Sequence, residues 1–254
     1  MAELKLDNVS RHFFGVQAVK DLTMSIAAGR ITGLIGPNGA GKTTVVNMIT
    51  GLLKLSGGRI LLNDRDIGQQ QPDQVARLGV ARTFQNIRLL KEASVIDNIA
   101  VGFHVSDESS FVAQALGLPS VRRTRVQMNE RVRKLLAEFA MSEYAECLAG
   151  ELSYGHQRRV EIMRALALEP DVLLLDEPVA GMNDVEAHEL GAIFRSLADR
   201  GLAVLVIEHN MDLVMKLCDE VYVLESGELI SHGVPEQVRA DPRVIEAYLG
   251  VAAC

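Results

Sequence analysis

The sequence contains few of the residues that define several common classes of protein. It has no tryptophan, and its seven phenylalanines and four tyrosines form no pattern typical of RNA stacking. Its three cysteines, Cys147, Cys218 and Cys254, are odd in number and lack the spacing of metal ligands. We therefore expect reduced thiols that belong to neither a disulfide framework nor a metal site.

Long apolar runs and an excess of positive charge are also absent. No run approaches the ~18 apolar residues that a membrane-spanning helix needs. The first nine residues carry Glu3, Lys5 and Asp7 instead of the apolar segment of a signal peptide, so we expect a cytoplasmic chain. The 33 acidic and 26 basic residues give a net charge of −7, which argues against non-specific binding to nucleic acid.

What is present is the composition of a globular protein, with 48% hydrophobic and 23% charged residues among 254. Short apolar runs alternate with helical patterns. Strands are predicted over residues 4–9, 19–26, 31–35, 59–62, 172–175, 203–207, 220–225 and 228–232, and helices over 43–53, 155–168, 184–200 and 211–217. Such alternation predicts an α/β fold with a mostly parallel sheet flanked by helices.

The middle of the chain differs, because branched strand patterns disappear and helical spacing replaces them. Its clearest helix is Asn129–Phe139, and Ser106–Ser110 and Gly117–Arg125 are candidate loops. The apolar stripe of this helix consists of Val132, Leu135, Leu136 and Phe139. We predict a helical subdomain, at about residues 86–160, inserted into the α/β core.

A glycine-rich loop follows the predicted strand 31–35 and opens the next predicted helix. It fits the phosphate-binding pattern G-x-x-x-x-G-K-[ST] with Gly36, Pro37, Asn38, Gly39, Ala40, Gly41, Lys42 and Thr43. The glycines let successive N–H groups point at phosphate oxygens, and the helix N-terminus favours an anion. We expect Lys42 to reach the β- and γ-phosphates and the Thr43 hydroxyl to ligate Mg²⁺.

Two adjacent acids, Asp176 and Glu177, end the predicted strand 172–175. The carboxyl end of a parallel strand is where ligands bind in open α/β sheets. Beside a nucleotide, Asp176 is expected to hold Mg²⁺ through its water shell, and Glu177 to orient or deprotonate the attacking water. His209 follows the next predicted strand and is a candidate for contacting the γ-phosphate.

The octet Leu-Ser-Tyr-Gly-His-Gln-Arg-Arg, residues 152–159, resembles the signature sequence of ABC ATPases, usually written L-S-G-G-Q. Tyr154 replaces the first glycine, and His156 sits between the second glycine and Gln157. The resemblance implies a single ABC ATPase domain, 1–254, with a P-loop NTPase core and an N-terminal antiparallel β region. It also implies that Ser153 and Gly155, where a helix begins, bind the γ-phosphate of ATP held by a second subunit.

Other residues match elements of the family one by one. Gln85 resembles the Q-loop glutamine, a Mg²⁺ ligand and a link to the membrane partner. Phe13 resembles the aromatic residue that stacks on adenine, although Phe14 is adjacent and either ring could belong to the core. Asn183 stands where many members have an aspartate, and His209 matches the switch histidine. Two more residues are implied in nucleotide binding, Thr44 and Gln157.

A narrower resemblance is to the ATP-binding subunits of bacterial branched-chain amino acid importers. It lies in residues 83–89, 152–155, 180–183 and 241–250. The longer helical region, around residues 102–127, is similar to the larger of the two ATPase subunits in such systems. The ATPase of the lipopolysaccharide exporter shares the Tyr-Leu-Gly ending but not the Thr-Phe-Gln-Asn context of residues 83–86.

The resemblance implies an ATP-hydrolysing motor, with ATP and Mg²⁺ as cofactors, on the cytoplasmic face of the inner membrane. Its partners are expected to be a second ATPase subunit (the same chain or a paralogue), two membrane permease subunits and, indirectly, a solute-binding protein. The alternatives are the ATPase of an exporter of a lipid-like substrate, a soluble ABC ATPase acting on DNA or ribosomes, and a regulatory ATP-binding module. The acidic balance and the lack of long coiled coils or a second ATPase domain argue against the soluble class.

Overall fold

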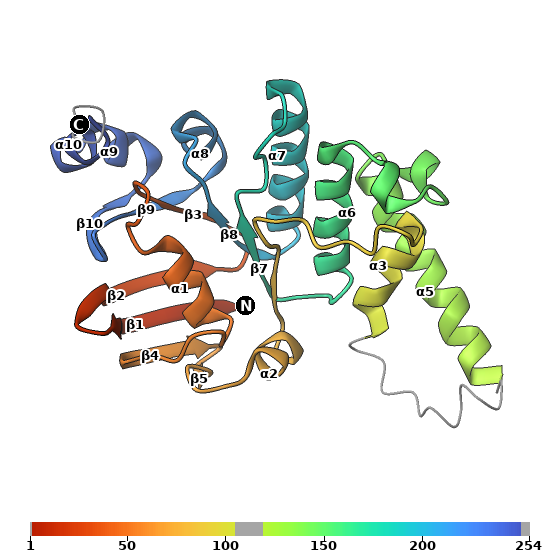
Figure 1. Cartoon of the computed structure of the whole chain (residues 1–254), viewed down its shortest axis with the longest axis horizontal. Coiled ribbons are helices and arrows are strands. Elements are labelled where there is room, and N and C mark those ends of the chain that lie inside the picture. The colour runs from red at the N-terminus through yellow and green to blue at the C-terminus, as the bar shows by residue number, and fades with distance from the viewer. Residues whose placement is uncertain (1, 105–118, 250–254) are drawn as a thin grey trace. The chain divides into compact units, whose positions relative to one another are not determined.

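The computed structural model describes residues 2–104 and 119–249, so the candidate loop Ser106–Ser110 lies outside the described residues (Figure 1). Its contacts divide the chain into two compact units. We call Met1–Arg82, Asp171–Pro178 and Phe194–Cys254 the core unit, and Thr83–Pro170 and Val179–Ile193 the helical unit. The helical unit contains the predicted subdomain of about 86–160 and extends beyond it at both ends.

The core unit begins with a four-stranded antiparallel sheet in the order β2-β1-β4-β5. Its strands are β1 (Glu3–Phe13), β2 (Val16–Ala27), β4 (Gly57–Leu62) and β5 (Arg65–Asp66). Alternating residues, such as Leu4 and Leu6 in β1, are buried, as expected for a sheet with one face on the core. A tight turn at Phe14-Gly15, with φ of 45° and 91°, joins β1 to β2.

The second sheet of the core unit has six strands in the order β10-β9-β3-β8-β7-β6. They are β3 (Ile31–Ile35), β6 (Val80–Arg82), β7 (Val172–Asp176), β8 (Ala203–Ile207), β9 (Glu220–Glu225) and β10 (Glu228–Gly233). All neighbours pair in parallel except β9 and β10. Strands β3, β7 and β8 are buried along their whole length, which explains their continuous apolar sequences. The predicted mostly parallel sheet is confirmed.

The core unit also carries short helices, several of which the sequence patterns did not predict. They are α1 (Lys42–Ile49), α2 (Pro72–Arg77), α8 (Met211–Leu217), α9 (Pro235–Ala240) and α10 (Pro242–Leu249). Helix α1 is shorter than the predicted 43–53. It ends because Gly51 adopts a φ of 72° and its N–H bonds back to the carbonyl of Met48, a common way of terminating a helix.

Helix α1 is held by the hydrophobic core of this unit. Its buried side chains are Val45, Val46, Met48 and Ile49. They belong to one apolar cluster with residues of both sheets, including Leu6 of β1 and Leu34 of β3. Because this face of the helix packs in one cluster with residues of both sheets, the first turn of α1 is held at the end of the loop 36–41 that follows β3.

The helical unit is built from α3 (Val95–His104), α5 (Pro119–Glu138), α6 (Tyr154–Leu166) and the first part of α7 (Asp184–Asp199), with short 3-10 turns at Ser142–Tyr144 and Ala149–Glu151. Val132, Leu136 and Phe139 of the predicted stripe are buried. The prediction of a loop over Gly117–Arg125 was wrong, because α5 already begins at Pro119, and proline is favoured in the first turn of a helix.

No helix in residues 2–104 and 119–249 combines the length and the apolar character that crossing a membrane requires.

We predict that Cys218 does not react with an aromatic disulfide reagent while the protein is folded. Burial raises the pKa of its thiol to about 12, so the thiolate is scarce at mildly alkaline pH. A variant with Cys147→Ser and Cys254→Ser leaves Cys218 as the remaining thiol. The expected result is no absorbance change in buffer and one equivalent in guanidinium chloride. Rapid reaction in buffer would contradict the burial of this side chain.

Candidate functional site

The glycine-rich loop connects β3 to α1, as the sequence predicts. Two of its glycines are required by the local geometry. Gly36 has a φ of 148°, and a Cβ there would lie 2.1 Å from the carbonyl oxygen of Leu224. Gly41 has a φ of 104°, and a Cβ there would lie 2.6 Å from the carbonyl oxygen of Ala18. The loop can therefore pass this close to the neighbouring backbone only without these side chains.

Lys42 folds back over this loop. Its Nζ donates to the carbonyl oxygens of Gly36 at 2.6 Å and Pro37 at 3.0 Å. Burial lowers the pKa of Lys42, while the charges of Glu177 and Asp176 act in the opposite direction. Gly41, which precedes the helix, offers α1 no side-chain cap. A cation and the N-terminus of a helix thus converge on the loop, as expected of an anion site.

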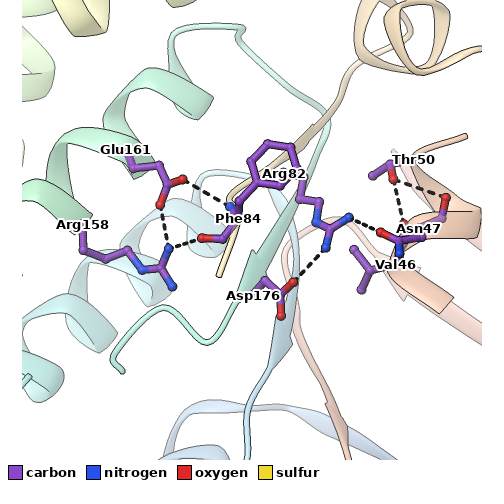
Figure 2. Close-up of polar contacts among 8 residues, drawn as sticks. All are labelled: Val46, Asn47, Thr50, Arg82, Phe84, Arg158, Glu161 and Asp176. Atoms are coloured by element: carbon purple, nitrogen blue, oxygen red, sulfur yellow. Dashed lines mark hydrogen bonds and ion pairs between the residues drawn. The ribbon is translucent and has the colours of Figure 1, made fainter. Parts of the chain in front are cut away.

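The acid pair lies at the end of β7. Asp176 is buried, and Glu177 follows it with a left-handed φ of 48° and donates its N–H to the carbonyl of Ile207 at 2.9 Å. The Asp176 carboxylate accepts a hydrogen bond from Arg82 Nη2 at 2.8 Å (Figure 2). Sequence reasoning missed Arg82, because nothing in its neighbourhood along the chain indicates a distant acidic partner.

His209 lies beside Glu177, as its position after the next strand predicts. Strands β7 and β8 pair in parallel, with Asp176 opposite Ile207, so the residues that follow each strand are neighbours. His209 Nδ1 is 3.7 Å from Glu177 Oε1, which is too long for a hydrogen bond, and the imidazole is 64% exposed. A carboxylate and an imidazole thus lie next to each other at the carboxyl ends of β7 and β8.

The candidate adenine-stacking residues differ in their surroundings. Phe13 is the last residue of β1 and half-buried, and the guanidinium of Arg11 lies 4.6 Å from the centre of its ring. Phe14 is at the tip of the turn and wholly exposed, with a φ of 45°. Neither ring belongs to the hydrophobic core cluster of the core unit, so the reading of either as a core residue loses support.

In the helical unit, Gln85 is exposed and follows Phe84, whose backbone carbonyl and N–H are both hydrogen-bonded to side chains. Arg158 donates to the carbonyl oxygen of Phe84, and Glu161 Oε1 accepts from the N–H of Phe84 at 3.3 Å (Figure 2). The two side chains also pair with each other, at 2.6 Å between Arg158 Nη1 and Glu161 Oε2, and both are buried. The backbone just before Gln85 is therefore tied to α6.

Helix α6 starts at the signature sequence. Ser153 is its N-cap and accepts from the N–H of His156 at 3.3 Å, and Gln157 Nε2 donates to the carbonyl of Leu152 at 2.9 Å. Gly155 is buried, and a Cβ there would lie 3.4 Å from Glu186 Oε1. Ser153 and Gln157 therefore both stabilise the first turn of α6.

Asn183 has a local structural role that sequence reasoning missed. Its Oδ1 accepts from the N–H of Glu186 at 2.9 Å, and its own N–H donates to Glu186 Oε2 at 3.1 Å. This reciprocal pair is a capping box at the start of α7. The signal was available, because an asparagine followed three residues later by a glutamate is typical of a helix start.

The residues proposed for Mg²⁺ fit the preferences of that ion. Thr43 is exposed in the first turn of α1, and Asp176 is at the carboxyl end of β7, both in the core unit. Gln85 is exposed in the helical unit. All three offer oxygen atoms, which Mg²⁺ prefers, and it usually takes few protein ligands besides water and phosphate. Among the described residues no group of three His, Cys, Asp or Glu side chains could hold a metal ion.

Comparison with known proteins gives consistent matches over nearly the whole chain. The family profile described as "ABC transporter" matches residues 19–180, and that described as "Branched-chain amino acid ATP-binding cassette transporter" matches residues 228–254. The transport ATP-binding protein LivG of Escherichia coli (strain K12) is 41% identical over 250 residues, which is 98% of each chain. BraF of Pseudomonas aeruginosa is 40% identical with the same coverage.

Two further comparisons concern a different transport system and a solved structure. LptB, the ATP-binding protein of the lipopolysaccharide export system of Escherichia coli (strain K12), is 34% identical over 98% of each chain. The crystal structure of a nucleotide-free ATP-binding cassette from an ABC transporter is 33% identical, with a TM-score of 0.85 over 98% of this chain and 99% of that one.

These likenesses extend through the phosphate loop, the signature sequence and the acid pair. All three segments lie within residues 19–180, the part of the chain that the ABC transporter profile matches. The chain therefore belongs to the ABC transporter family, as one of its ATP-hydrolysing subunits.

Proposed function

We propose that this ATPase drives the import of branched-chain amino acids from the cytoplasmic face of the inner membrane. The observation that carries the proposal is the likeness to LivG and BraF, whose names state this transport, over 98% of the chain. The match of residues 228–254 to the branched-chain family profile supports it at the C-terminal end, outside the general ABC match.

The core unit binds and hydrolyses ATP in this proposal. Lys42 exchanges its bonds to loop carbonyls for bonds to the β- and γ-phosphates, and Phe13 stacks on adenine. Glu177 accepts a proton from the attacking water, and the neighbouring imidazole of His209 contacts the γ-phosphate. Thr43, Asp176 and Gln85 would hold Mg²⁺, and the chemistry that the bound ion would supply is neutralisation of the phosphate charges.

The helical unit connects ATP to a partner. Ser153 and Gly155, at the N-terminus of α6, bind the γ-phosphate of ATP held by the second ATPase subunit, which is the same chain or a paralogue. ATP therefore favours a closed dimer and hydrolysis reopens it, a population shift driven by differential affinity. Gln85 links this cycle to two membrane permease subunits, to which a solute-binding protein delivers the amino acid.

Export of a lipid-like substrate is the second candidate function. The likeness to LptB, at 34% identity over 98% of the chain, favours it over the remaining alternatives. The importer subunits are more similar, at 40–41% identity over the same share of the chain. We therefore keep import as the first proposal.

Lys42→Ala is expected to abolish detectable ATP binding. The change removes the cation that lies over the phosphate loop, while the glycines that shape the loop remain. Equilibrium titration with a fluorescent ATP analogue measures the effect. Lys54→Ala is the matched control, because Lys54 also donates to backbone carbonyls, those of Gln69 and Gln70, on the same unit. Unchanged ATP affinity in Lys42→Ala would contradict the phosphate-loop assignment.

Glu177→Gln is expected to lower ATP turnover by about 10²-fold or more, because the amide cannot accept a proton from water. ATP should remain bound, and the closed dimer should accumulate with the second subunit. Phosphate release measures turnover, and light scattering during size-exclusion chromatography measures the dimer. Glu228→Gln, which changes an exposed ion pair with Lys20, serves as the control. Turnover at the wild-type rate in Glu177→Gln would show that Glu177 is not the base.

Purification of the tagged chain from detergent-solubilised membranes tests the partners. Mass spectrometry should find two multi-span permease subunits and a second ATPase, and the associated binding protein should bind branched-chain amino acids. Lipid-export components in their place would favour the second candidate function. Recovery of ribosomes or DNA alone would retain the ATPase chemistry and refute the transport proposal.

A further inference from the structure

The guanidinium of Arg82 joins two elements of the core unit. Arg82 ends β6, and its side chain is only 9% exposed. Its Nη2 donates to Asp176 Oδ2 at 2.8 Å, and its Nη1 donates to Asn47 Oδ1 at 2.6 Å. Figure 2 shows the side chain of Arg82 between these two partners, one on β7 and the other on α1.

Each partner of Arg82 lies on an element that carries a predicted Mg²⁺ ligand. Asp176 is itself one of them. Asn47 lies four residues after Thr43 on α1, and residues four apart are neighbours on the same face of a helix. Arg82 therefore links the helix that presents the Thr43 hydroxyl to the strand that ends in Asp176.

Arginine suits this position for two physical reasons. The Asp176 side chain is only 8% exposed, and a buried carboxylate is costly unless a counter-charge and hydrogen bonds accompany it. The planar guanidinium also presents several donors in a fixed fork, so that one group can hold two acceptors at a set separation. A lysine ammonium supplies the charge but not this fork.

We propose that Arg82 is a positioning residue of the magnesium centre. By holding Asp176 and Asn47 together, it sets the separation of Thr43 and Asp176 before nucleotide arrives, and thereby the affinity of the ATP site for Mg²⁺. Arg82 acts through its two partners and is not itself a ligand. The inference rests on the proposed function, because that proposal makes Thr43 and Asp176 the magnesium ligands.

The test measures Mg²⁺ affinity through nucleotide binding and not through activity. Binding of a fluorescent ATP analogue at a fixed, sub-saturating concentration is followed while free Mg²⁺ is raised from an EDTA-containing buffer. The variants are Arg82→Lys, which keeps the charge, and Asn47→Ala, which keeps the bond between Arg82 and Asp176. The Asp176→Asn variant reports on the magnesium site itself.

Arg195→Lys is the matched control. Arg195 is another arginine of the core unit whose guanidinium donates to two acceptors. They are Asp219 Oδ2 at 2.9 Å and the carbonyl oxygen of Leu217 at 2.6 Å. Neither Asp219 nor Leu217 is a predicted magnesium ligand. If replacing any such arginine by lysine weakens nucleotide binding in this unit, Arg195→Lys will show the same loss.

Arg82→Lys and Asn47→Ala are each expected to raise the half-saturating Mg²⁺ concentration by about tenfold, the lower end of what the loss of a partner of a metal ligand costs. ATP binding in EDTA should stay at the wild-type level, excess Mg²⁺ should restore binding, and Arg195→Lys should behave as wild type. This result supports the proposal.

Other results would overturn it in distinguishable ways. If Asp176→Asn shifts the Mg²⁺ dependence while Arg82→Lys and Asn47→Ala match the wild type, the role of Arg82 is refuted and the magnesium site is retained. A loss of ATP binding in EDTA, or an equal shift in Arg195→Lys, also refutes it, because the effect is then not specific to the metal. If ATP binding to the wild type does not depend on Mg²⁺, the magnesium site of the proposed function is refuted, and the proposed role of Arg82 is refuted with it.

Discussion

The core unit depends on burying one face of a short helix whose first turn has no side-chain cap. The apolar side chains of α1 fix it in the cluster that joins both sheets, while Gly41 offers its N-terminal N–H groups no acceptor. Unpaired N–H groups at a helix start require partners, and an anion is one of the few that can satisfy several together. Packing thus positions the proposed phosphate site, because the apolar spacing within α1 determines where its N-terminal N–H groups point.

In each unit a buried arginine holds a segment that carries or adjoins proposed site residues. In the core unit Arg82 holds Asp176 and Asn47, and in the helical unit Arg158 holds the backbone of Phe84 together with Glu161 (Figure 2). Removing one member of such a pair leaves an uncompensated buried charge, so these contacts tolerate change poorly. Arg82 itself and Phe84, which Arg158 contacts, lie on either side of Thr83 in the sequence, and Gln85 follows Phe84.

Prediction from sequence succeeded where a contiguous stretch of residues determines the local structure. The buried strands β3, β7 and β8 are continuous apolar runs, and the phosphate loop is a contiguous pattern between a strand and a helix. It failed for Arg82 and Arg158, because Asp176 and Phe84 are 94 and 74 residues away along the chain. Helices α2 and α9 have only six residues each, too few to show a helical period. The site residues that act with a partner subunit stay predictions.

The charges of the core unit explain why a divalent cation should accompany ATP. Lys42 and Arg82 bring two positive charges near the carboxylates of Asp176 and Glu177, so the site is close to neutral before nucleotide arrives. Burial lowers the pKa of Lys42, while the charges of Glu177 and Asp176 act in the opposite direction. A triphosphate adds several negative charges beside two carboxylates, and at short range in such surroundings like charges repel strongly. Under the proposed function, a Mg²⁺ ion held by Thr43 and Asp176 would offset part of this added negative charge.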